Sequence, residues 1–224
     1  MISRLKGLGI VLAVLGLAFM AAGAFAFIKV QDGQASLNGF SAAQNVTLSY
    51  DENGKLGGEE GDAIMALLKN DWKYPVVDAE LNPNDPVVNT ASEYMYQLAT
   101  ITYHTLNAET TVVLNEDVTA KDGTVYKAGE YTFKNDGRYW TGFDRNNPIE
   151  GAARGQIWTA TAHALIGELG VGTVTAQALQ LGLGLAGLFA GVGFTFLLAG
   201  GGLVWATRSE DAAVRVARRV EVTA

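Results

Sequence analysis

The sequence of 224 residues contains no cysteine, so it can form neither a disulfide bond nor a thiolate metal site. It has only two histidines, His104 and His163, and four prolines. The HExxH, GxSxG, P-loop and dinucleotide-binding patterns are also missing. These absences exclude most of the common catalytic and cofactor-binding arrangements, and the sequence predicts no metal and no cofactor.

Positive charge is scarce in the middle of the chain. Residues 1–30 carry a net charge of +3, residues 31–206 carry −11, and residues 207–224 carry +1. Nucleic acids are bound by basic patches, which this acidic sequence does not offer. The sequence therefore predicts no nucleic-acid partner.

Two long uncharged, apolar runs dominate what is present: Gly7–Ile28 and Leu181–Ala206. Each is long enough for a transmembrane helix, which needs roughly 20 residues. The first run, with its small residues Ala22, Ala24 and Ala26, also resembles a secretory signal peptide, whose apolar core spans roughly 7–15 residues. Because the run is longer than that, we predict a signal anchor that stays attached.

Both runs are rich in glycine, which lets helices approach closely in a membrane. Gly9, Gly16 and Gly23 recur every seven residues and form one stripe, which we expect to pack against the second run. That run contains Gly184 and the GxxxG pair Gly187 and Gly191, which we expect to leave a separate face for a partner. The alternative is that glycine is simply common in membrane helices.

The charges at the ends of the two runs predict the orientation, because positive residues favour the cytoplasmic side. Arg4 and Lys6 precede the first run, and Arg208 follows the second, so both termini are expected in the cytoplasm of a cell-membrane protein. The predicted organisation is a membrane helix in 1–30, an extracytoplasmic α+β domain in 31–175, a second membrane helix in 176–207 and a basic tail in 208–224. The tail, with Arg215, Arg218 and Arg219, could lie on an anionic membrane surface or be solvated.

The first half of the central domain predicts a strand and two helices. Val46, Leu48 and Tyr50 alternate with polar residues and precede an Asn-Gly turn, as in a strand or hairpin. A short helix is expected over 62–69. Thr90 and Glu93 have the spacing of a capping box, which would open a helix running to about residue 107.

The second half of the central domain predicts short strands followed by a helix. Glycine turns separate short alternating segments between residues 110 and 134, a pattern typical of an antiparallel β-meander. Asn147 and Pro148 have the features of a helix start. We expect this helix to continue to Leu169 and to end at Gly170 and Gly172.

The histidines are the remaining candidates for chemistry. His104 and His163, with an acid such as Glu93 or Glu168, could in principle supply a two-histidine, one-carboxylate iron site. Each histidine lies inside a predicted amphipathic helix, however, where a structural role is the more common one. We therefore assign neither residue to a metal site.

Several stretches resemble a family of small two-span actinobacterial membrane proteins. They are the N-terminal 50 residues beginning MISRLKGLGIVLAVLGLAFM, the DGRYW of Asp136–Trp140 and the GELGVGTVT of Gly167–Thr175. The resemblance implies two membrane spans around a central domain. Some members carry the label of an aromatic ring-opening dioxygenase, but no set of iron ligands can be matched here residue by residue.

The sequence as a whole predicts a non-catalytic accessory or interaction subunit of a membrane assembly. Its expected partners are the lipid bilayer and another membrane protein or a second copy of the chain. The alternative is a membrane-anchored non-haem iron dioxygenase of the ring-opening type.

Overall fold

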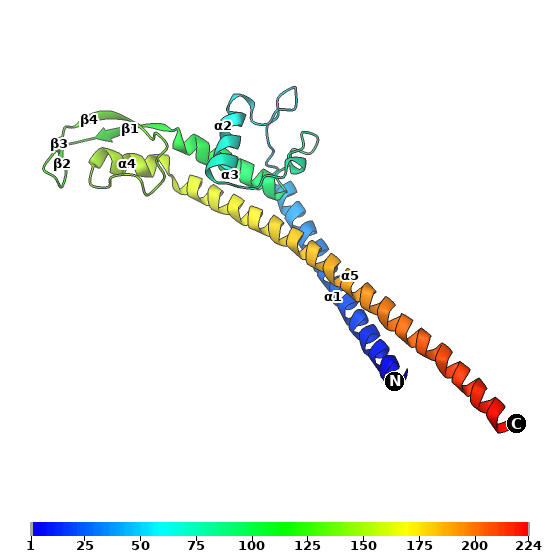
Figure 1. Ribbon diagram of the computed structural model, residues 1–224. Helices are drawn as coiled ribbons and strands as arrows, with labels where there is room; N and C mark the ends of the chain where they lie inside the picture. The colour runs from blue at the N-terminus through cyan, green and yellow to red at the C-terminus, as the bar shows by residue number, and fades with distance from the viewer. Residues whose placement is uncertain (1, 224) are drawn as a thin grey trace. The chain divides into compact units, whose positions relative to one another are not determined.

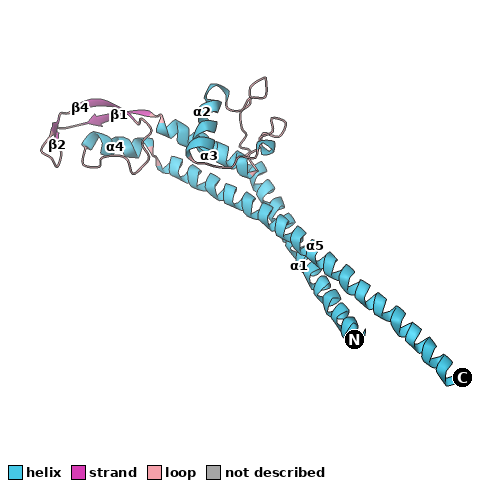
Figure 2. Cartoon of the chain, in the orientation of Figure 1, coloured by secondary structure: helices cyan, strands magenta, loops and turns pink. Residues whose placement is uncertain are grey.

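The computed structural model describes residues 2–223, with side chains for residues 4–208. The chain is mostly helical, with two long apolar helices, α1 (Ile2–Gln44) and α5 (Ala160–Thr223), and a small antiparallel sheet (Figures 1 and 2). It divides into two compact units. The helical unit comprises α1 up to Ser36 and α5 from Gln177, and the mixed unit comprises Leu37–Ala176. The tail residues Arg215, Arg218 and Arg219 lie outside the described side chains.

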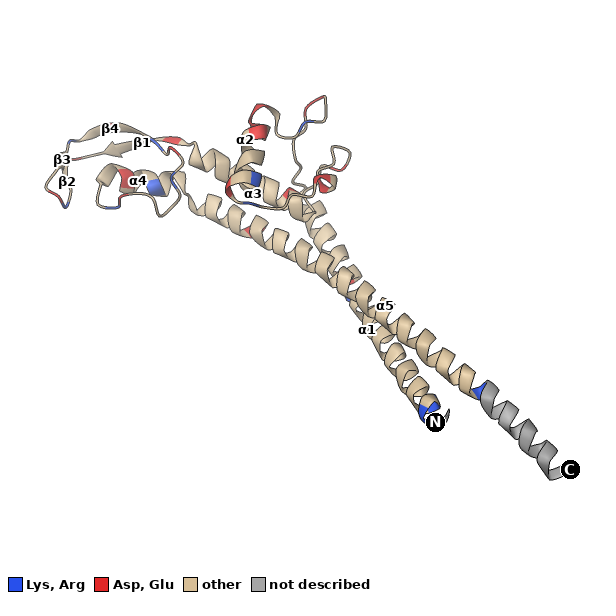
Figure 3. Ribbon diagram, viewed as in Figure 1, with Lys and Arg blue, Asp and Glu red and all other residues tan. Residues whose placement is uncertain are grey.

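The two long helices are set apart from other helices of the protein by their composition. Long stretches of α1 and α5 carry no charge, whereas the charges of the mixed unit are spread over its loops and short elements (Figure 3). Within the described residues, α1 and α5 are each long and apolar enough to cross a membrane. Only 11% of the most apolar window of each helix is buried inside the structure. A core helix of a water-soluble protein would be mostly buried, so these two helices are compatible with a two-span membrane protein.

The mixed unit begins with loops and short helices. One-turn 3₁₀ helices, η1 (Gly58–Glu60) and η3 (Asp78–Glu80), flank α2 (Gly61–Ala66) and a π-helical turn, η2 (Leu67–Asp71). The short helix predicted over 62–69 is therefore confirmed. The strand predicted over Val46–Tyr50 is reduced to two isolated bridges, Thr47 with Val87 and Tyr50 with Leu56. The Asn-Gly turn is present, with Gly54 at φ +77°.

Helix α3 (Ala91–Leu106) starts as the sequence predicts. The Thr90 side chain accepts a hydrogen bond from the backbone N–H of Glu93, and the Glu93 carboxylate caps the Thr90 N–H in return. Glu93 Oε2 accepts from the backbone N–H of Asn89 (3.0 Å) and Thr90 (2.8 Å) and from Thr90 Oγ1 (2.8 Å). Glu93 as a whole is only 2% exposed. From this buried position the Glu93 carboxylate accepts hydrogen bonds from backbone N–H groups at the start of α3.

The strands form a nested hairpin and not the predicted meander. Strand β1 (Glu109–Leu114) pairs antiparallel with β4 (Gly129–Lys134), with Thr111 opposite Thr132. The inner strands β2 (Val118–Thr119) and β3 (Val125–Tyr126) pair with each other. The predicted meander was wrong because β4 pairs with β1 and not with its neighbour β3. Alternation along the sequence does not specify such a non-local pairing.

Helix α4 (Pro148–Ile157) covers one face of this hairpin. Asn147 caps its start by accepting from the N–H of Ile149 and Glu150, as predicted from the Asn-Pro pair. Inward-facing residues of β1 and α4 share a core with neighbouring helices and loops. That core consists of Leu67, Leu106, Val112, Phe143, Ile149, Ala153, Ile157 and Trp158. Because strand residues alternate in direction, Val112 and the partly buried Leu114, two residues apart on β1, both face this core.

The helix predicted to end at Gly170 and Gly172 instead breaks earlier, at Trp158 and Thr159. Thr159 Oγ1 accepts from the N–H of Ala162 and caps the start of α5. Gly170 and Gly172 lie inside α5, so the predicted end was wrong. Gly172 has a packing reason to be there: a Cβ at this position would lie 2.6 Å from the ring of Tyr94 in α3. A glycine chosen for close approach cannot be told from a helix terminator by sequence alone.

The capping carboxylate makes the stability of the protein depend on pH. Burial raises the pKa of Glu93, against the lowering effect of its hydrogen bonds from Asn89 and Thr90, with Asp85 also raising it. A raised pKa in the folded state means that folding favours the protonated form. The associated stability is complete below the ordinary value of 4.5 and is lost as the pH rises through the folded-state pKa.

We therefore expect Glu93→Gln to remove this pH dependence, because an amide oxygen can accept the same hydrogen bonds without a buried charge. The variant should gain thermal stability over the wild type as the pH rises from about 4 to 7. Glu93→Ala, which removes the cap, should cost about 1 kcal/mol or more at every pH. Thermal unfolding followed by circular dichroism measures both. Parallel pH curves for the wild type and the glutamine variant would contradict the prediction.

Candidate functional site

The helical unit is built on a close approach of α1 and α5. A Cβ on Gly16 would lie 2.7 Å from both the carbonyl oxygen of Gly193 and the backbone N of Leu197. A Cβ on Gly9 would lie 2.8 Å from the oxygen of Gly200. Carbon atoms do not pack at such distances, so the two backbones touch with no room for a side chain. We call this contact the glycine seam.

The seam has a regular antiparallel register. Gly9 lies against Gly200, Gly16 against Gly193 and Gly23 against Ala186. The contact is reciprocal, since a Cβ on Gly193 would lie 2.7 Å from the oxygen of Gly16. Each step is seven residues on both helices, close to two helical turns, so the same face of each helix returns to the seam.

Sequence reasoning identified one half of the seam and missed the other. Gly9, Gly16 and Gly23 are the predicted stripe, and the structure places all three against α5. Their opposite residues on α5, Ala186, Gly193 and Gly200, were not singled out. Their spacing of seven residues matches that of α1, and comparing the two spacings would have found them. The GxxxG pattern drew attention to Gly187 and Gly191 instead.

Gly184, Gly187 and Gly191 lie on another face of α5. Successive helix residues are about 100° apart, so these glycines lie roughly 100–160° around the helix from Ala186. A Cβ on any of the three would meet nothing within 4 Å among the described residues. These glycines therefore take no part in the seam.

Two of these open glycines, Gly187 and Gly191, line a shallow apolar groove. Its volume is about 490 Å³, and it is lined by Gly187, Leu188, Gly191, Val192, Thr195 and Phe196. Thr195 Oγ1 donates to the carbonyl oxygen of Gly191 at 2.9 Å, so its hydroxyl is satisfied within α5 and the groove stays apolar. The side chain of Leu188 is 58% exposed and forms part of its wall. We call this the α5 groove.

A second apolar groove adjoins the first where α1 meets α5. Its volume is about 530 Å³, and Gly187 lines both grooves. Its other lining residues are Met20, Gly23, Ala24 and Phe27 from α1 and Leu183, Ala186 and Ala190 from α5. A single side of the helical unit therefore offers two shallow depressions bounded by apolar side chains.

The two histidines lie in different surroundings. His104 Nε2 lies 2.8 Å from the Glu60 carboxylate at the surface, a contact that becomes an ion pair when the imidazole is protonated. His163 packs between the rings of Trp140, at a centroid distance of 4.9 Å, and Trp158, at 5.6 Å. Glu93, a candidate third ligand from the sequence, is buried in the cap of α3. Within the described residues, no three histidine, aspartate or glutamate side chains gather as they would around a metal ion.

The rings around His163 belong to an aromatic cluster that the sequence did not predict. The Arg154 guanidinium lies 3.3 Å above the centroid of Trp140, and its Nε donates to the Trp140 carbonyl oxygen. Trp158 Nε1 donates to the carbonyl oxygen of Arg138. Trp158 belongs to the core described above, and Trp140 packs against that core, so cation–π contact and burial of the rings stabilise the break between α4 and α5.

Comparison with protein-family models, with curated proteins and with solved structures gives no match. The predicted kinship with small two-span actinobacterial membrane proteins stays a prediction. The geometry of the helical unit is therefore the basis for a proposal about function.

Replacing a seam glycine should destabilise the helix pair, whereas replacing an open glycine should not. We expect Gly16→Leu to lower the stability of the helical unit by about 1–3 kcal/mol, because the side chain would have to displace the backbone of α5. Gly7→Leu is the matched control, since a Cβ on Gly7 would meet nothing within 4 Å among the described residues. Thermal unfolding in detergent measures both. Equal midpoints for the two variants would contradict the seam.

Proposed function

We propose that the protein is a non-catalytic integral membrane protein that acts as an accessory or interaction subunit of a membrane assembly. In this proposal α1 and α5 both cross the membrane, and the α5 groove receives a helix of another membrane protein or of a second copy. The observation that carries the proposal is that α5 presents small residues on two faces. One of these faces packs against α1, and a Cβ on the glycines of the other would meet nothing within 4 Å among the described residues.

The exposed surface of the helical unit supports a membrane location. Large apolar side chains point outward from both helices, among them Val14, Leu17, Phe25, Leu181 and Leu198, each at least 60% exposed. In water this surface would drive aggregation, whereas lipid chains cover it without penalty. The seam accounts for the pattern, because small residues face inward and leave the large ones outside.

The shallow, glycine-lined shape of the α5 groove supports a helix as its occupant. Lipid chains are mobile and fill a shallow groove over glycine poorly, whereas a helix laid across it gains close van der Waals contact. The seam shows the same use of glycine within this chain. The absence of ionisable residues from Gly7–Ile28 and Leu181–Ala206 agrees with an interaction role, since intramembrane charges usually mark transport or proton relay.

The proposed orientation has both termini in the cytoplasm and the domain of residues 31–175 on the other side. We expect labels placed beside Ile2 and Ala224 to be accessible only from the cytoplasm, and a label in the Asp122-Gly123 turn only from outside. Because the protein has no native cysteine, single introduced cysteines report their positions without background. Labelling of intact cells with a membrane-impermeant maleimide measures this. Labelling of the turn only after lysis would contradict the orientation.

Filling the α5 groove should abolish association. We expect the double variant Gly187→Leu/Gly191→Leu to insert and fold normally, because leucine favours both helix and bilayer, but to lose its membrane partner. The matched control is Gly7→Leu/Gly201→Leu, which makes the same two exchanges at positions where a Cβ would meet nothing within 4 Å among the described residues. Native mass spectrometry after detergent extraction compares each complex with the 23.7 kDa of one chain.

The outcomes separate the possible partners. A wild-type mass of two chains, lost in the groove variant and kept in the control, identifies a second copy. A larger or different mass with the same dependence identifies another protein. A monomer in all three samples, with no other protein bound, would contradict the proposed function.

A further inference from the structure

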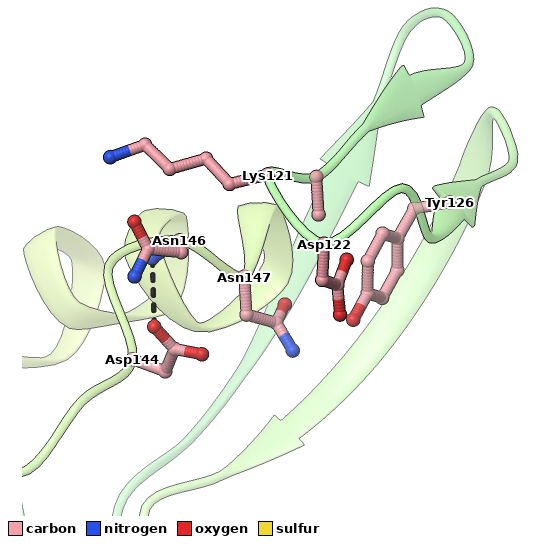
Figure 4. Close-up of a pocket in the computed structure, with 7 residues that line it drawn as sticks. Lys121, Asp122, Tyr126, Asp144, Asn146 and Asn147 are labelled. Atoms are coloured by element: carbon pink, nitrogen blue, oxygen red, sulfur yellow. Dashed lines mark hydrogen bonds between the residues drawn. The ribbon is translucent and has the colours of Figure 1, made fainter.

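A polar pocket lies in the mixed unit, between the turn that joins β2 to β3 and the segment that leads into α4 (Figure 4). Its volume is about 370 Å³, at the lower end of the range of about 300–1,000 Å³ found for small-molecule sites. Its polar lining comes from Lys121, Asp122, Tyr126, Asp144, Asn146 and Asn147. Neither the α5 groove nor the seam contributes to it.

Two of these side chains use one polar atom in a hydrogen bond within the protein and leave their other polar atom free for a ligand. Asn147 Oδ1 is engaged by the start of α4, whereas its Nδ2 makes no hydrogen bond with the described residues. Asp144 Oδ1 accepts from the N–H of Asn146 at 2.9 Å, and its Oδ2 is likewise without a partner in the described part of the chain. The pocket therefore presents a fixed amide donor and a fixed carboxylate acceptor.

Figure 4 shows Asp122, Tyr126 and Asn147 pointing toward the same space, while Lys121 extends away from it. Tyr126 is partly buried against the core, which fixes its ring, and its hydroxyl has no hydrogen bond to the residues described. Hydrogen bonds from Thr124 lower the pKa of the Asp122 carboxyl, so it stays ionised and accepts hydrogen bonds over the physiological range. An aromatic ring and hydrogen-bonding groups from two segments of the chain thus surround the same space.

Charge limits which ligands this pocket can accept. Two carboxylates, Asp122 and Asp144, disfavour an anion. A bare metal ion is disfavoured as well, since among the described residues no three carboxylates or imidazoles converge. A neutral polyhydroxylated molecule fits the remaining chemistry, because its hydroxyl groups can donate to the carboxylates and accept from the amide. Its C–H surface can pack on the tyrosine ring.

We propose that this pocket binds a neutral saccharide, with Tyr126 packing against the sugar ring while Asp122, Asp144 and Asn147 hydrogen-bond its hydroxyl groups. This site is separate from the α5 groove and goes beyond the proposed function. A subunit anchored through its apolar helices would then also hold a sugar through its polar unit.

The test is isothermal titration of the full-length protein in a detergent without a sugar head group. The probes are cellobiose, maltose and chitobiose. Asn147→Asp keeps the helix cap, because aspartate caps as well as asparagine, but replaces the free amide donor by an acceptor. Asp122→Asn keeps the turn, which asparagine also forms, and removes the charged acceptor. Asp117→Asn is the matched control in the same hairpin, at a residue that does not line the pocket.

We expect at least one disaccharide to bind the wild type with a Kd on the order of 1 mM. Asn147→Asp and Asp122→Asn should each weaken this binding about tenfold or more, and Asp117→Asn should leave it unchanged. Circular dichroism checks the fold, and if Asn147→Asp did not fold, Asp122→Asn would decide alone. The proposal is overturned if no probe binds, if both pocket variants bind as the wild type does, or if the pocket takes calcium chloride and no sugar.

Discussion

The contact of backbone with backbone between Gly16 and Gly193 is the constraint on which the helical unit depends. Two helices can come this close only where neither carries a side chain, so small residues must face each other at every second turn. Larger apolar residues are then left on the outside of the pair. The same contact therefore explains both the cohesion of the two helices and the apolar surface that they present to their surroundings.

The mixed unit is held together by a different kind of interaction. Glu93 is buried at the start of α3 and accepts hydrogen bonds from the cap, and the buried Asn135 donates through Nδ2 to the carbonyl oxygen of Thr105. Three other buried atoms of this unit, Tyr50 OH, Tyr96 OH and Asn135 Oδ1, have no hydrogen-bond partner among the described residues. Tyr94 joins two helices: its hydroxyl lies 2.7 Å from Ser41 Oγ of α1, and its ring lies against Gly172 of α5. Specific hydrogen bonds thus contribute to the packing of the mixed unit, whereas the helical unit is held by close contact between small residues.

The sequence predicts the parts of this structure that depend on neighbours along the chain. The capping box of Thr90 and Glu93, the Asn147 cap and the two apolar helices are local patterns, and all are present. Pairings between distant segments were harder: β1 pairs with β4 across an inner hairpin, and Trp140 and Trp158 meet around His163. Those contacts depend on three-dimensional packing, which periodicity does not encode. Gly172 was misread for the same reason, since its role is to make room for Tyr94.

The regular spacing of the seam leaves one property undetermined, namely how far one helix is displaced along the other. If α1 moved by seven residues, or about 10.5 Å, small residues would again face small residues over most of the seam. The glycine repeats therefore allow close packing but do not determine how far one helix is displaced along the other. The choice falls to contacts that do not repeat: Phe19 packs between Phe189 and Phe196, and Gly33 lies beneath the side chain of Leu179. Bulky residues beside the seam thus determine the register of the two helices.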